Sequence, residues 1–163
     1  MSRRGLLVIA SLLVSSLGVS QESPVLGLDE KRSIDALLAD YVQAFVAKDY
    51  VKLRDCLQAP LVRLTAAGEP NVVSTLDEVI ALYHTLRDPL DQRGYASSKP
   101  KGDAHISVLA RDRVLVNRAY SRYKTDGSLL EEVSSFYLMS KSSGKWKITG
   151  LISQGAAFTG KSY

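Results

Sequence analysis

The chain has 163 residues, of which 45% are hydrophobic and 23% charged, a balance typical of one soluble globular domain. Its formal net charge is only +4, and Arg3 and Arg4 contribute two of the positive charges, so binding to nucleic acid is not indicated. One cysteine and two histidines exclude an intramolecular disulfide and leave little for a transition-metal site. We therefore expect no metal and no cofactor.

Residues 1–20 are predicted to be a secretory signal peptide. Arg3 and Arg4 form a basic start, residues 5–19 carry no charge, and small residues precede a cleavage ahead of Gln21. The uncharged run is shorter than the roughly 20 residues of a typical membrane span. We expect a secreted or periplasmic protein with no membrane contact after processing. An uncleaved N-terminal membrane anchor and a core helix are the alternatives.

Residues 21–29 are predicted to be a linker, and a helical pattern begins at Ser33. Apolar side chains then recur at helical spacing on one face: Ile34, Leu37, Leu38, Tyr41 and Phe45. A short second helix follows and ends before Pro60, because the residue before a proline is disfavoured in the helical region.

Two short strands, at residues 61–65 and 71–73, are expected next. Thr75 and Glu78 form a capping-box pattern that predicts the start of a third helix. Pro89 predicts the end of this helix, and residues 91–101 are predicted to be a polar loop.

The last third of the chain changes to the two-residue period of strands, so that Trp146, Ile148 and Ile152 are predicted to share one face. Strands joined by short turns are expected at residues 105–110, 114–124, 129–141 and 145–154. Helices followed by such strands indicate an α+β fold, with a curved antiparallel sheet wrapped around three N-terminal helices. Residues 155–163 are expected to form a flexible tail.

Three stretches resemble the nuclear transport factor 2-like superfamily, also called the SnoaL-like or ketosteroid isomerase-like fold. They are the helix with the segment YVQAFVAKDY (residues 41–50), the helix that begins at Thr75, and the hairpin at residues 123–127 with the strands after it. The likeness covers about residues 30–154. It implies a cone-shaped domain with a pocket open at one end, and a homodimer formed through the outer face of the sheet.

The resemblance also suggests where catalytic groups would lie. Tyr41 matches the hydrogen-bond-donating tyrosine of the ketosteroid isomerases, but their base position falls at Thr65, whose hydroxyl cannot take a proton from carbon at neutral pH. We therefore favour a protein without catalysis. The alternative is a lyase or isomerase, dehydratase-like or cyclase-like, that acts on a small, largely apolar substrate with His84 or His105 and Tyr41 as catalytic groups.

The expected ligand-binding residues are Tyr41, Phe45, Tyr83, Arg118, Tyr120 and Trp146. Arg118 shares a strand face with two valines, so it projects toward the pocket if the valines do. A partly buried arginine needs an anionic partner, which is either Glu131 or Glu132 on the next strand or a carboxylate of the ligand.

The sequence thus predicts an exported small-molecule-binding or non-catalytic dimeric domain. Its expected ligand is small and is apolar or carboxylate-bearing. A structural or interaction domain whose cone is filled by side chains is a third alternative.

Overall fold

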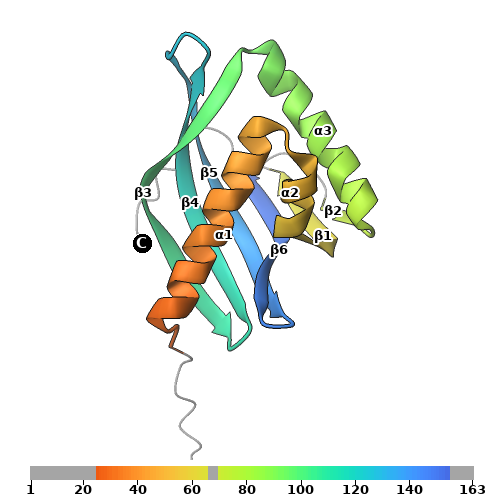
Figure 1. The fold of residues 1–163 in the computed structure, drawn as a ribbon, viewed down its shortest axis with the longest axis vertical. Coiled ribbons are helices and arrows are strands. Elements are labelled where there is room, and N and C mark those ends of the chain that lie inside the picture. Colours follow the sequence, from red (N-terminus) through yellow and green to blue (C-terminus); the bar gives the residue numbers. More distant parts are fainter. Residues whose placement is uncertain (1–24, 66–69, 155–163) are drawn as a thin grey trace, which may run out of the picture.

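The computed structural model describes residues 25–65 and 70–154, so the predicted signal peptide and the predicted tail lie outside the described residues. Helices and strands follow one another in this order: α1 (Leu28–Ala47), α2 (Tyr50–Cys56), β1 (Leu57–Thr65), β2 (Asn71–Val73), α3 (Leu76–Gln92), β3 (Tyr95–Ala110), β4 (Arg113–Lys124), β5 (Leu129–Ser142) and β6 (Lys145–Gln154). The helix α1 crosses one face of the sheet diagonally, and α3 covers the end formed by β1 and β2 (Figure 1).

The strands form one sheet in the order β2-β1-β6-β5-β4-β3. The neighbouring strands are antiparallel except for β1 and β6, which are parallel. The predicted α+β class, with a curved sheet wrapped around three helices, is confirmed. None of the helices in the described ranges has the length and hydropathy needed to span a membrane.

Helix α1 begins five residues before the predicted start at Ser33 and includes the last two residues of the predicted linker. Asp29 and Glu30 lie in its first turn, where their negative charges interact favourably with the helix dipole. The helix ends at Ala47, and the capping residue Lys48 takes the left-handed conformation with φ 56°. Ile34, Leu38, Tyr41 and Ala44 are the buried positions, so α1 lays its apolar face on the sheet.

Two predictions in the middle of the chain are wrong. Pro89 does not end α3, which continues to Gln92 because Arg87 and Leu90, on either side of the proline, are buried and anchor the last turn. Most of the predicted loop at residues 91–101 is instead the first half of β3, which begins at Tyr95, while residues 91 and 92 complete α3. Pro100 is tolerated there because β3 is an edge strand, in which one side of the backbone needs no ladder hydrogen bond.

Arg87 of α3 fastens the C-terminal end of α1. Its Nη1 donates to the carbonyl oxygens of Phe45, at 2.8 Å, and Val46, at 3.1 Å. Its Nε donates to Asp91 at 2.7 Å, and its guanidinium carbon lies 4.5 Å from the centre of the Tyr95 ring. Among the described residues, the Phe45 carbonyl otherwise accepts only from the Lys48 N–H, at 3.4 Å. A cation from another helix therefore supplements the hydrogen bonds at the end of α1, which has no basic residue in its last turn.

Candidate functional site

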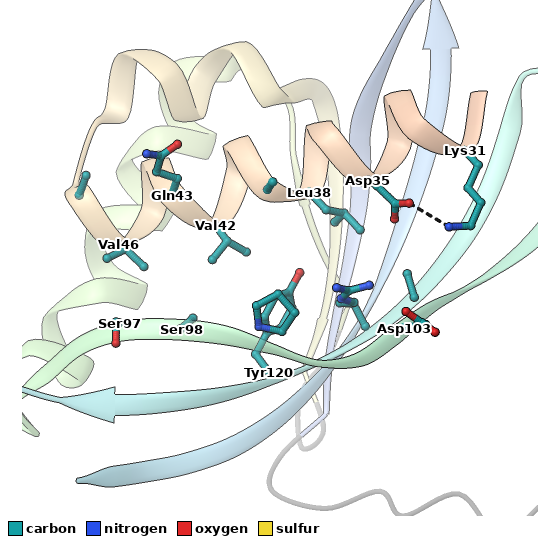
Figure 2. A pocket seen from close by; sticks show the side chains of 15 residues that line it. Lys31, Asp35, Leu38, Val42, Gln43, Val46, Ser97, Ser98, Asp103 and Tyr120 are labelled. Carbon is teal, nitrogen blue, oxygen red and sulfur yellow. Dashed lines mark hydrogen bonds and ion pairs between the residues drawn. The ribbon is translucent and has the colours of Figure 1, made fainter. Parts of the chain in front are cut away.

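A groove of about 630 Å³ runs between α1 and the strands β3 and β4. We call this space the α1–β3 groove (Figure 2). Its apolar walls come from both sides and include Leu38, Val42, Val46, Pro100 and Ala104. Helix α1 forms one apolar wall of the groove because Leu38, Val42 and Val46 recur every four residues, which places them on one side of the helix.

The polar residues of the groove are unevenly distributed along its length. Lys31 and Asp35 form an ion pair of 3.0 Å beside Asp103 at one end. Gln43 and the two serines Ser97 and Ser98 lie toward the other end (Figure 2). The groove therefore has a charged section at one end of an apolar trough.

Arg118 reaches the groove from β4 and is half-buried. Among residues 25–65 and 70–154, no side chain forms an ion pair or a hydrogen bond with its guanidinium. The two carboxylates predicted as its partners are engaged elsewhere. Glu131 pairs with two other arginines and Glu132 with a lysine: Arg93 at 2.6 Å, Arg122 at 2.8 Å and Lys101 at 2.6 Å.

The strand register explains why the expected ion pair does not form. Ser135 lies directly across from Arg118, whereas Glu131 lies across from Arg122, four residues along the strand. At about 3.3 Å per residue, that offset is about 13 Å, beyond the reach of an ion pair. Glu132 points to the opposite face of the sheet, because successive side chains on a strand alternate.

Tyr120 lines the groove two residues from Arg118, and its ring points toward α1 (Figure 2). Three further tyrosines lie buried beside it in the core, where the Tyr83 hydroxyl donates to that of Tyr41 at 3.1 Å and the rings of Tyr41 and Tyr137 are 5.5 Å apart. Burial raises the pKa of all four hydroxyls, most clearly those of Tyr41, Tyr83 and Tyr137. At neutral pH these groups are therefore hydrogen-bond donors and not bases.

The candidate catalytic histidines lie outside the groove. His84 is exposed on α3 and its ring stacks on that of Tyr50, with 3.7 Å between the centroids. His105 is exposed on β3. The third candidate, Tyr41, is only 7% exposed and faces the core. The side chain of Thr65, the predicted base position, is outside the described part of the molecule.

Of the predicted ligand-binding residues, the groove contains Arg118 and Tyr120. Phe45 and Tyr83 pack edge to face in the core, with ring centroids 6.1 Å apart. Trp146 is buried on β6, and its Nε1 donates to Glu30 at the start of α1, at 2.5 Å. The structure therefore does not place Tyr41, Phe45, Tyr83 and Trp146 in the groove with Arg118.

Several groove residues have no counterpart in the sequence prediction: Lys31, Asp35, Gln43, Ser97, Ser98 and Asp103. The two serines fall in the segment predicted as a loop, and the α1 residues lie beside the dominant apolar stripe. The four-residue recurrence of Leu38, Val42 and Val46 is the signal that could have revealed this side of the helix. In the described ranges, no cluster of three metal-binding side chains is present.

A family described as NTF2-like protein (DUF6841) matches residues 29–156. No curated protein matches the chain. The chain is also similar to solved structures whose sequences differ widely from its own. A protein of unknown function with a cystatin-like fold from Nostoc punctiforme has 12% identity and a TM-score of 0.65, with 82% of this chain and 96% of that chain covered.

Two other solved structures carry names that suggest an activity. A ketosteroid isomerase-like protein from Erwinia carotovora atroseptica has 16% identity and a TM-score of 0.56, with 78% of this chain and 97% of that one covered. A proposed dehydratase of the NTF2-like family from Streptomyces avermitilis has 15% identity and a TM-score of 0.58, with 77% and 95% covered. At these identities the likeness concerns the fold alone.

Proposed function

Because the chain belongs to the NTF2-like family DUF6841, we propose that it binds a small, largely apolar molecule in the α1–β3 groove. The molecule presents an oxygen acceptor, a carboxylate or a carbonyl, to Arg118. The observation that carries this proposal is the half-buried side chain of Arg118, which has no partner among the described side chains and lies in a groove with apolar walls. A cation in that position needs an acceptor, and a ligand can supply it.

The size and lining of the groove support this proposal. Its volume of about 630 Å³ lies within the range of roughly 300–1,000 Å³ that is usual for small-molecule sites. Such sites combine apolar walls with a few polar groups that orient the ligand. Here the guanidinium offers several donors in a planar fork, and the Tyr120 hydroxyl, which burial keeps protonated, offers another.

We propose binding in preference to the lyase or isomerase alternative. Both histidines lie outside the groove, and the tyrosine inside it has a raised pKa. Of the two carboxylates at the charged end, Asp35 is already paired with Lys31 and Asp103 is exposed to solvent. The names of the ketosteroid isomerase-like protein and of the dehydratase apply to those two proteins and do not assign an activity to this chain.

A groove-filling substitution tests the proposal. Ala39 is exposed and lines the groove, so Ala39→Trp should fill the trough and weaken binding of the fluorescent probe anilinonaphthalene sulfonate at least about tenfold. The matched control is Ala36→Trp, which adds the same side chain to the same helix at an exposed position outside the groove. Fluorescence titration gives both affinities. Equal affinities for the two variants would show that the probe binds elsewhere and would count against the groove as the site.

We also propose export, on the basis of the pattern in residues 1–20. The mature protein should begin at Gln21, and N-terminal sequencing of material from the medium or periplasm tests this. An intact N-terminus in the membrane fraction would favour the anchored alternative.

We further propose a homodimer formed through the outer face of the sheet. Half-buried apolar side chains of β4, β5 and β6 gather on that face, away from the helices: Leu115, Phe136, Leu138 and Ile152. Phe136→Asp should convert a dimer into a monomer in sedimentation experiments, since a charge in the middle of an apolar interface is costly. A wild-type protein that sediments as a monomer would contradict this proposal.

A further inference from the structure

A second cavity of about 250 Å³ adjoins the charged end of the α1–β3 groove. The two spaces share Lys31 and Ala104. Apart from Lys31, the residues around the second cavity are apolar or glycine: Leu26, Gly27, Leu28, Ala104, Ile106 and Val108. The trough thus continues beyond the charged section and becomes apolar again.

The register of β3 and β4 gives the order of these sections. Tyr120 lies across from Pro100, within the groove, while Val116 and Val114 lie across from Ile106 and Val108, which line the second cavity. Arg118 falls between these pairs on the same face of β4. Its guanidinium therefore lies between two apolar sections and not at the end of one.

The charges around Arg118 balance one another. Lys31 and Arg118 are positive, Asp35 and Asp103 are negative, and all four line the groove at its charged end (Figure 2 labels Lys31, Asp35 and Asp103). Because the charges balance, the repulsion of the two aspartates offsets the attraction of Arg118 and Lys31, and a carboxylate gains no net charge interaction to compensate for its lost hydration. A neutral carbonyl oxygen accepts from the guanidinium without that repulsion.

From this arrangement we propose that the ligand is an elongated neutral molecule with an internal carbonyl, such as an ester or a ketone, and an apolar arm on each side. The carbonyl accepts from Arg118, one arm occupies the α1–β3 groove and the other occupies the second cavity. This inference rests on the proposed function, because it assigns the chemical class of a ligand bound in the same groove. It goes further in committing to a carbonyl over a carboxylate and to its internal position.

Two isomeric esters and the anion of their isomeric acid, which we call the three isomers, separate the position of the acceptor from its charge. Hexyl octanoate has an internal neutral ester, methyl tridecanoate has a neutral ester at one end, and tetradecanoate has an anionic group at one end. Each methylene moved from water into an apolar site improves affinity about fourfold. Because only hexyl octanoate can place methylenes on both sides of Arg118, we expect it to displace anilinonaphthalene sulfonate at a concentration at least about tenfold lower than the other two.

A substitution that closes the second cavity locates the second arm. Gly27 lines that cavity, and a Cβ at this position meets no atom within 4 Å, so Gly27→Trp can fill it without backbone strain. We expect Gly27→Trp to remove the advantage of hexyl octanoate while the affinity for methyl tridecanoate stays within about twofold. Gly27→Ala, which leaves the cavity open, is the matched control and should behave like the wild type.

The outcomes distinguish this inference from the proposed function. If Ala39→Trp abolishes binding of all three isomers but the wild type binds them equally, or prefers tetradecanoate, the internal-carbonyl inference fails and the groove remains the binding site. If hexyl octanoate keeps its higher affinity in Gly27→Trp, the second arm does not occupy the second cavity, and the inference is also contradicted. If no isomer binds, or if Ala39→Trp leaves all binding unchanged, both proposals fail.

Discussion

Replacing Arg87 by methionine is expected to lower the free energy of unfolding by about 3 kcal/mol. Methionine keeps much of the apolar volume of the arginine stem but has no donor. The carbonyl oxygens of Phe45 and Val46 then lose their charged donor in a place where Arg87 itself is only 4% exposed, and Phe45 keeps only the Lys48 N–H at 3.4 Å. A buried acceptor without a partner costs about 1–3 kcal/mol, and the loss at Val46 together with the weakened bonding at Phe45 gives the expected value.

Part of the network should survive this substitution. Asp91 also pairs with Lys48 at 2.6 Å and its side chain is 31% exposed, so it keeps a partner and contact with water. For this reason we expect a loss near 3 kcal/mol and not the larger value of a fully isolated buried charge. Urea denaturation, followed by circular dichroism, measures the change.

Arg32→Met is the matched control for Arg87→Met. Arg32 lies on the exposed face of α1, and its ion pair with Asp29 joins side chains that are 80% and 96% exposed. Exposed pairs of this kind contribute little, so the control should change the free energy of unfolding by less than about 0.5 kcal/mol. A similarly small effect for Arg87→Met would mean that α1 does not depend on a donor from α3.

The second large effect is expected on binding. Arg118→Met should weaken the binding of anilinonaphthalene sulfonate about 10-fold to 100-fold, because a hydrogen bond from a charged donor contributes about 1.5–3 kcal/mol. The same substitution should change the free energy of unfolding by less than about 1 kcal/mol. No described side chain depends on the guanidinium, and the methionine preserves the apolar stem.

Parallel titrations and urea denaturation of the same variant separate a binding role from a structural one. Arg113→Met provides the control, since Arg113 is an exposed arginine of the same strand and lies outside the groove. An unchanged affinity together with a large loss of stability in Arg118→Met would show that Arg118 supports the fold and not a ligand.

Periodicity and capping patterns were sufficient to predict most of the fold. The helical stripe of α1, the Thr75–Glu78 capping box and the turn residues between the last strands all act locally, so they can be recognised in the sequence. The pairing of β1 with β6 could not be recognised in this way. It joins segments far apart in the chain, and no local pattern encodes which strand becomes the neighbour of another.

The position of Ile152 could not be predicted from strand periodicity, because the strand β6 contains a register shift. The two-residue period places it on the same face as Trp146 and Ile148, and this prediction is wrong. The register of β5 and β6 shifts by one residue beside Thr149, whose hydroxyl donates to the carbonyl oxygen of Leu138. Every side chain after the shift therefore changes face, and Leu151 becomes the buried one.

The candidate site was predictable only in part. The alternation along β4 correctly placed Arg118 and Tyr120 on the inner face beside Val114 and Val116. The partner expected for Arg118 depended on the register between β4 and β5, which sequence alone does not specify. Ser97 and Ser98 were missed because polar residues near Pro100 resemble a loop, although their strand lies at the sheet edge.

Native mass spectrometry of the wild type and of Ala39→Trp, both purified from the native host, is the sharpest test of ligand binding in the α1–β3 groove. We predict that the wild type retains a small molecule whose mass is lost on denaturation, and that Ala39→Trp retains none. If the two proteins carry the same bound mass, or if both are empty, the α1–β3 groove is not a binding site and the proposed function is contradicted.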